Sequence, residues 1–212
     1  MLDPKLEHSR RSRPRLPLPL KLAFTAWVLV WAPSIITLLG PQNFFWICNL
    51  ANFLILIGLW TESRLLLSMQ WLSVALIGFF WGIDVGMAWL TGVHPIGGTA
   101  YMLDPDFPVA AKLLSFYHLA LPVISGFAVY RLSYDSRALP WQAGLIALLV
   151  PLSWWLTDPE RNVNMVHVPL GLDQIDWPAL IYLPLLVLAW VVILLLPVHA
   201  LSQWLQRRGQ VE

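Results

Sequence analysis

Apolar residues are gathered into six long segments separated by short polar stretches. A helix that crosses about 30 Å of hydrocarbon needs roughly 20 mainly apolar residues, and each segment is close to that length. The pattern therefore predicts an all-α protein, a polytopic membrane helix bundle of about six transmembrane helices. The third segment is the longest, so we expect it to tilt or to extend past the membrane interface. The segments cover residues 20–39, 43–60, 65–90, 113–132, 138–156 and 179–205.

If these helices alternate in direction, nearly all Lys and Arg residues fall on one side of the membrane. That side holds Lys5, Arg10, Arg11, Arg13, Arg15, Lys21, Arg64, Arg131, Arg137, Arg207 and Arg208. The other side holds Lys112, Arg161, Asp104, Asp106, Asp158, Glu160, Asp173 and Asp176. Positive residues accumulate on the cytoplasmic side of membrane proteins. The charges therefore predict that both termini are cytoplasmic (N-in/C-in), in a multi-pass protein of the cell inner (plasma) membrane.

Composition supports a membrane protein and excludes several other classes. Hydrophobic residues make up 58% of the chain and charged residues 12%, whereas soluble domains carry about 25% charged residues. One cysteine excludes an intramolecular disulfide and a zinc site built from several thiolates. The basic residues form short runs beside apolar segments, so no nucleic-acid partner is expected. The expected partners are membrane lipids and other membrane subunits.

The chain is expected to contain one folded domain. Residues 1–19 are basic and rich in proline, which predicts a flexible cytoplasmic arm. Residues 20–206 form the predicted six-helix membrane domain, and residues 207–212 form a cytoplasmic tail.

Several polar residues fall inside the predicted helices, at one depth near the outer surface. Cys48 and Asn49 lie roughly 8 Å inside the second helix, and Asn52 follows on the same face as Cys48. Asp84 falls at the outer end of the third helix, His118 roughly 9 Å inside the fourth, and Asp158 after the fifth. Ionisable groups within a membrane are expensive to bury, so each one is a candidate functional residue.

Two short segments resemble a known superfamily. Residues 45–50 (FWICNL) and 116–122 (FYHLALP), with residues 162–164 (NVN), resemble six-helix membrane proteins. That group comprises uncharacterised bacterial membrane proteins, androgen-induced-type intramembrane hydrolases and related lipid acyltransferases. The resemblance implies cleavage or transfer of fatty acyl groups within the membrane, with Cys48 as nucleophile and His118 as general base. No cofactor and no metal is expected.

The candidate residues suit this chemistry. A histidine can take the proton of a thiol and so produce the nucleophilic thiolate. Asp84 or Asp158 could orient the imidazole, and Asn49 or Asn52 could donate to the developing oxyanion.

Other interpretations stay open on the sequence alone. Cys48 and His118 can be packing groups, and Asp84 can cap its helix. The chain can be a non-catalytic subunit of a larger membrane complex that binds pigment or lipid. A small permease, or a zinc or iron site formed by His94, His118, Asp84 and Asp158, is a further alternative. The inner halves of the helices are almost wholly apolar, which disfavours transport.

Overall fold

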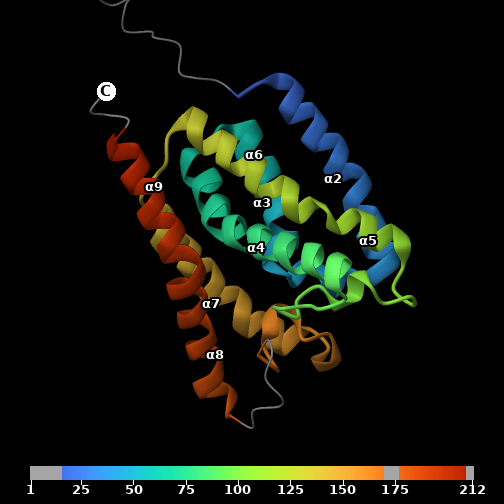
Figure 1. The fold of residues 1–212 in the computed structure, drawn as a ribbon. Helices are drawn as coiled ribbons and strands as arrows, with labels where there is room; N and C mark the ends of the chain where they lie inside the picture. Colours follow the sequence, from blue (N-terminus) through green and yellow to red (C-terminus); the bar gives the residue numbers. More distant parts are fainter. Residues whose placement is uncertain (1–15, 170–176, 209–212) are drawn as a thin grey trace, which may run out of the picture.

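The chain folds into a bundle of helices (Figure 1). The structure is a computed structural model, and it describes residues 16–169 and 177–208. Within these ranges every regular element is helical, so the predicted all-α bundle is confirmed. The main helices are α2 (Leu18–Leu39), α3 (Ile47–Thr61), α4 (Arg64–Thr91), α5 (Val109–Ser115), α6 (Tyr117–Leu132), α7 (Ala138–Leu156), α8 (Ala179–Ala189) and α9 (Leu196–Arg208). A π-helical segment, η5 (Trp190–Leu195), joins α8 to α9, and the short 3₁₀ helices are η1 (Pro41–Phe45), η2 (Ala100–Met102), η3 (Pro159–Arg161) and η4 (Val163–Met165).

The ends of the longest helix, α4, follow from local sequence signals. The side chain of Ser63 precedes the helix and accepts a hydrogen bond from the backbone N–H of Leu66, which satisfies a donor of the first turn. Gly92 ends the helix at φ 74°, a left-handed conformation that glycine adopts without strain. The predicted third helix, 65–90, therefore agrees with the observed one.

Five helical segments are long and apolar enough to cross a membrane, which indicates a multi-pass membrane protein. The second predicted helix, 43–60, is the exception. Its first residues form η1, and α3 has only 15 residues, so it rises about 22 Å, short of the hydrocarbon thickness. The second of the about six predicted helices is therefore present but shorter than predicted. Outward-facing side chains are apolar, as in Leu90 at 84% and Leu180 at 90% exposure.

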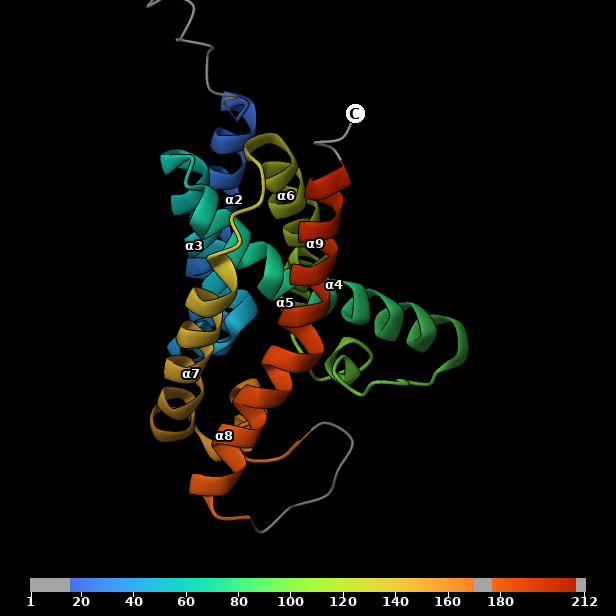
Figure 2. The same cartoon turned by 90° about the vertical axis from the view of Figure 1, so that its left-hand side faces the viewer.

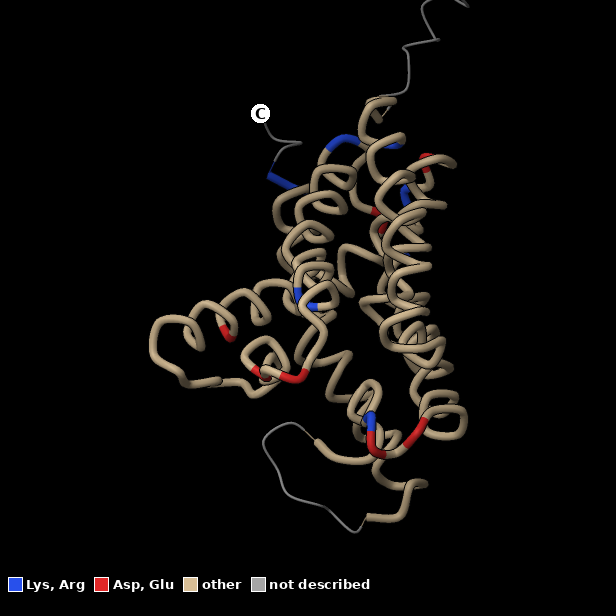
Figure 3. Tube along the Cα trace, turned by 90° about the vertical axis from the view of Figure 1, so that its right-hand side faces the viewer, with Lys and Arg blue, Asp and Glu red and all other residues tan. Residues whose placement is uncertain are grey.

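Ion pairs and hydrogen bonds define the two ends of the bundle. At one end, Lys21 at the start of α2 pairs with Glu62 after α3 over 2.6 Å, and Arg64 donates to the carbonyl of Ser133 after α6. We call this the basic end, because Lys and Arg gather there (Figure 3). At the opposite end, the loop after α7 meets η1, where the backbone N–H of Asp158 donates to Gln42. The helices therefore alternate as expected, and the assignment of the basic end to the cytoplasm stays a prediction.

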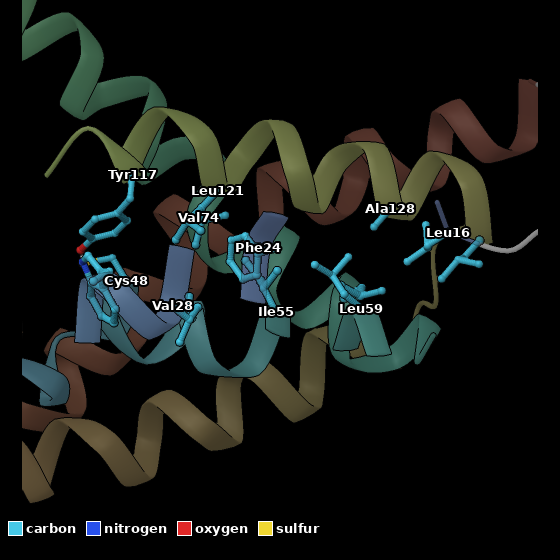
Figure 4. Close-up of a cluster of buried hydrophobic side chains, with 14 of the residues drawn as sticks. Leu16, Phe24, Val28, Cys48, Ile55, Leu59, Val74, Tyr117, Leu121 and Ala128 are labelled. Atoms are coloured by element: carbon cyan, nitrogen blue, oxygen red, sulfur yellow. The ribbon is translucent and has the colours of Figure 1, made fainter. Parts of the chain in front are cut away.

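Two groups of buried apolar residues hold the helices together. The first lies among α2, α3, α4 and α6 and includes Trp31, Ile55, Leu59 and Leu121 (Figure 4 draws part of it). The second lies among α4, α7 and the α8–α9 segment and includes Leu72, Ile146, Val150, Leu183 and Leu195. Helix α4 contributes to both groups, so it is the central helix of the bundle.

The C-terminal part of α4 leaves the bundle. Together with loop 92–108, it projects sideways from the other helices (Figures 2 and 3). At Gly78 the two helices α4 and α6 come very close, because a Cβ at this position would lie 2.3 Å from the carbonyl oxygen of His118 and 2.5 Å from Cγ of Pro122. Only glycine fits this approach.

The predicted arm and tail are described only in part. Helix α2 begins at Leu18, inside the predicted arm 1–19, and α9 continues through Arg208, inside the predicted tail 207–212. Residues 1–15, 209–212 and the acidic positions Asp173 and Asp176 lie outside the described residues.

Candidate functional site

A cavity of about 600 Å³ lies between α3, α6, the C-terminal part of α4 and the α8–η5 segment. Its volume falls within the range of about 300–1,000 Å³ that is typical of ligand pockets. Five residues from one face of α8 and η5 form an apolar wall, namely Leu186, Ala189, Trp190, Ile193 and Leu194. The polar lining residues are Asn43, Cys48, Asn49, Asp84, Thr99, Tyr101, Ser115, Tyr117, His118 and Arg161.

Helix α3 brings Cys48 and Asn49 to the cavity, and α6 brings Tyr117 to meet them. The hydroxyl of Tyr117 donates to Sγ of Cys48 over 3.3 Å and to Oδ1 of Asn49 (Figure 4 labels Tyr117 and Cys48 at the same end of the buried cluster). Because a hydroxyl carries one proton, it can serve only one acceptor at a time. The side-chain amide of Asn49 donates to the carbonyl of Asn43 over 2.7 Å, which fixes its orientation.

The imidazole of His118 is held in one tautomer. Its Nδ1 lies 2.7 Å from the backbone carbonyl of Ser115, and a carbonyl only accepts, so Nδ1 carries the proton and Nε2 is left as an acceptor. The ring is stacked between Trp81 at 5.1 Å and Tyr117 at 4.1 Å between centroids. A neutral histidine with a bare Nε2 can accept a proton from a ligand or a thiol.

The backbone around His118 departs from a regular helix, and its sequence explains why. Pro122 lacks an N–H, so the carbonyl of His118 receives no hydrogen bond from the next turn; this is the local opening that the sequence allows. The imidazole of His118 bonds the carbonyl oxygen of Ser115, which would otherwise accept from the N–H of Leu119. That N–H donates to the carbonyl oxygen of Phe116 instead. The result is the joint between α5 and α6 at Phe116.

Asp84 does not present its carboxylate to the cavity as a free group. It is 1% exposed, and its two oxygens accept from the N–H groups of Ile96, Gly97 and Thr99 and from the hydroxyl of Thr99, at 2.6–3.2 Å. Such charge-assisted bonds are about twice as strong as neutral ones. Asp84 therefore anchors loop 92–108 beside the cavity, where Ile96 and Thr99 form part of the wall.

Tyr101, in the same loop, supplies a further hydroxyl to the cavity. It accepts a hydrogen bond from the indole N–H of Trp81 over 3.0 Å. Burial raises the pKa of Tyr101 above its ordinary value. Its hydroxyl is therefore protonated at neutral pH.

The structure gathers four of the six candidate residues around the cavity: Cys48, Asn49, Asp84 and His118. Asn52 faces another way, because it accepts from the indole of Trp27 in α2 and donates to the carbonyl of Cys48. Asp158 caps η3 by accepting from the N–H of Glu160, and it does not line the cavity.

Cys48 and His118 share the cavity and have different hydrogen-bond partners. Cys48 contacts Tyr117, and His118 contacts Ser115. A direct proton transfer between them would require a change of side-chain rotamer at one of the two positions.

A metal centre from the histidines and carboxylates is not assembled in the described residues. No group of three or more His, Cys, Asp or Glu side chains in residues 16–169 and 177–208 is placed to hold an ion. His94 instead lies 3.1 Å from the hydroxyl of Thr99 and 3.9 Å from Asp84, as part of the loop anchor.

Three residues with clear roles at the site were not singled out from the sequence: Tyr117, Trp81 and Thr99. Tyr117 is adjacent to His118, and a polar aromatic residue beside a candidate histidine is a signal that could have been weighed. Trp81 is one of 13 tryptophans in the chain, and tryptophan is common at membrane interfaces, so its presence alone does not indicate a site. Thr99 lies 15 residues from Asp84, and no spacing rule links a loop residue to a helix carboxylate at that distance.

The comparisons with known proteins give no relative. No family model matches the chain, and neither a curated protein nor a solved structure matches it.

Proposed function

We propose that the protein binds the acyl part of a membrane lipid in this cavity. The observation that carries the proposal is the mixed lining of the cavity. Most of its lining residues are apolar, including Leu186, Ile193 and Leu194 of α8 and η5, and the polar cluster of Cys48, Tyr117 and His118 lines the same cavity. A lipid combines a long apolar chain with a polar linkage, so it can satisfy both parts of the lining. A π-helical segment in a cavity wall supports a binding role, since such segments are frequent at functional sites.

The binding proposal is tested by filling the cavity. Ala189 lines it, and Ala189→Phe should occupy the space of an acyl chain. Ala200→Phe is the matched control, because Ala200 is exposed on α9 and does not line the cavity. Native mass spectrometry of the detergent-purified protein should show a retained lipid for the wild type and for Ala200→Phe, and its loss for Ala189→Phe. Equal lipid content in all three proteins would contradict the proposal.

We further propose acyl transfer as the reaction at this site, consistent with the resemblance to lipid hydrolases and acyltransferases. The specific support is the tautomer of His118, whose Nε2 is free to accept a proton inside the cavity that Cys48 also lines. After a change of side-chain rotamer brings the two groups together, the thiol proton would move to Nε2, and the thiolate would attack the carbonyl carbon of an ester to form a thioester. The proton on Nε2 would then pass to the departing alkoxide, and water or a second alcohol would release the acyl group.

This reaction predicts labelling of Cys48 by a long-chain thiol-reactive probe, such as an alkyl bromoketone. Cys48→Ala should abolish the labelling and His118→Ala should slow it at least tenfold. His199→Ala is the control, since His199 contacts Tyr134 away from the cavity. If the labelling of Cys48 does not depend on His118, His118 is not the general base for this thiol. Lipid retention without any labelling would favour a non-catalytic lipid-binding subunit.

A further inference from the structure

Two of the residues that line the cavity carry a formal charge, Asp84 and Arg161. Asp84 is buried, and its two oxygens accept four hydrogen bonds from loop 92–108. These hydrogen bonds compensate the negative charge of Asp84 within the protein. Arg161 is exposed and stands at the end of the bundle opposite the basic end, in η3.

The guanidinium of Arg161 is positioned by one contact. Its Nη2 donates to the carbonyl of Leu39 in the last turn of α2. A cation at a helix C-terminus is favourable, because the carbonyl groups there carry partial negative charge. A guanidinium has five N–H donors, so this contact leaves most of them unused.

No carboxylate of the described residues pairs with this cation. The ion pairs within residues 16–169 and 177–208 join Lys21 with Glu62, His94 with Asp84, and Arg137 with Asp135. The neighbours Asp158 and Glu160 do not pair with Arg161, and the carboxylate of Asp158 accepts from the backbone of Glu160. The positive charge at the cavity edge is therefore not neutralised by the described part of the chain.

Apolar residues of α2 line the same cavity as Arg161. Ile35 and Leu39 lie four residues apart on one face of α2, and both line the cavity. A molecule that contacts this cation and enters the cavity would place its charged group at the edge and its apolar part against α2, α8 and η5. An anionic lipid has this arrangement, with a charged headgroup at one end and an apolar chain at the other.

We propose that the ligand is an anionic lipid, whose carboxylate or phosphate group is bound by Arg161 while its acyl chain occupies the cavity. This inference rests on the proposed lipid binding and adds the charge of the headgroup. A guanidinium suits both groups, because its N–H donors can bond two oxygens at once.

The test compares two probes that differ only in charge. Dibromostearic acid and its methyl ester have the same chain, and their bromine atoms quench tryptophan fluorescence. Trp46, Trp81 and Trp190 line the cavity and report binding. At pH 9 the acid is ionised, since carboxylic acids titrate near pH 4. The protein in a neutral detergent should bind the acid about tenfold more tightly than the ester.

Substitutions assign this preference to Arg161. Arg161→Gln should bind both probes with the affinity that the wild type shows for the ester, and Arg161→Lys should retain most of the preference. Lys112→Gln is the control, because the ammonium of Lys112 contacts the carbonyl of Asp104 and does not line the cavity; it should bind as the wild type does. Gel filtration confirms that each variant is folded.

The outcomes distinguish headgroup binding by Arg161 from lipid binding in the cavity. Equal affinity of the wild type for acid and ester, or a preference that survives in Arg161→Gln, would show that Arg161 serves only to cap α2. If the wild type bound neither probe, the lipid-binding proposal itself would fail. A third probe carries the same chain on a lysophosphatidate. If the lysophosphatidate binds more tightly than the acid, the headgroup is a phosphate. If it binds more weakly, the headgroup is a carboxylate.

Discussion

Polar residues are buried in both halves of the bundle, but their surroundings differ. In one half they are packed among apolar side chains, and in the other they line a cavity. Near the basic end, Gln70 and Gln142 lie between α4 and α7, at 1% and 0% exposure, with packed apolar side chains around them. In the other half, Cys48, Asn49 and His118 line an open cavity. Gln70 and Gln142 are sealed from solvent and can only contribute to the pairing of α4 with α7. The cavity residues keep hydrogen-bonding capacity for a ligand. The proposed site therefore lies in the half that is opposite the basic end.

The largest expected effect comes from Gly78, where α4 and α6 approach between the two halves. Gly78→Ala would place its Cβ 2.3 Å from the carbonyl of His118, and the helices would have to separate. Overpacking of this kind costs about 1–3 kcal/mol, and more where backbone must move. Thermal unfolding in detergent, followed by circular dichroism, should show a clear loss of stability. Gly86→Ala on the same helix has open space and should unfold as the wild type does; equal loss in both variants would refute the argument.

The next effect concerns the loop that forms part of the cavity wall. Asp84→Asn removes the charge and one of the two acceptor oxygens that hold Ile96, Gly97 and Thr99. Unpaired buried donors cost about 1–3 kcal/mol, so the loop should open more often. Hydrogen–deuterium exchange should become faster in residues 92–108 and stay unchanged in α7. Asp104→Asn is the control, since the carboxylate of Asp104 accepts one hydrogen bond within an exposed turn. Unchanged exchange in Asp84→Asn would mean that apolar packing alone holds the loop.

A smaller effect is expected in the sealed half. The Nε2 of Gln70 donates to Oε1 of Gln142 over 3.4 Å, and Nε2 of Gln142 has no partner. Gln142→Leu removes the unpaired Nε2 of Gln142 but leaves Nε2 of Gln70 without its acceptor, so its free energy of unfolding should stay close to that of the wild type. The double variant Gln70→Leu/Gln142→Leu should be more stable by about 1 kcal/mol, because no donor of this pair is left unpaired. Lipid retention should be the same in all of these proteins. A loss of retained lipid in the double variant would show that the two halves are not separate in function.

The smallest effect is a pH dependence at the basic end. Hydrogen bonds from Arg137 hold the pKa of Asp135 below its ordinary value. A lowered folded-state pKa adds stability above the ordinary value near 3.9, and this contribution is lost as the pH falls through the lower folded value. The pair is largely exposed on the Arg137 side, at 72%, so solvent screening keeps the contribution small. Between pH 5 and pH 3, the wild type should therefore lose slightly more stability than Asp135→Asn. An identical decline would show that the pair contributes nothing.

The sequence predicted the helices better than it predicted the contacts between them. The predicted fifth segment, 138–156, has the bounds of α7, because an apolar run flanked by polar residues suffices to locate a long helix. The second segment failed at its start. Gly40 ends α2 and Pro41 begins η1, and counting apolar residues does not detect a change from α-helical to 3₁₀ geometry.

The candidate site shows the same limit. Helical spacing placed Cys48 and Asn52 on one face, and the amide of Asn52 does bond the carbonyl of Cys48. The indole of Trp27 then takes the remaining acceptor of Asn52 from the neighbouring helix. Spacing within one helix cannot predict a partner on another, so Asn52 was assigned to the site and Tyr117 was not.

The central claim is that the cavity half holds a lipid, and photo-crosslinking tests it most directly. A fatty acid with a diazirine in its chain is irradiated with the protein in detergent, and the labelled peptides are identified. The account predicts labelling concentrated on the cavity faces of η5 and α4, around Ile193 and Ile77, and removed by excess unlabelled palmitate. Labelling spread evenly over outward-facing positions such as Leu29 and Leu148, without competition, would contradict it.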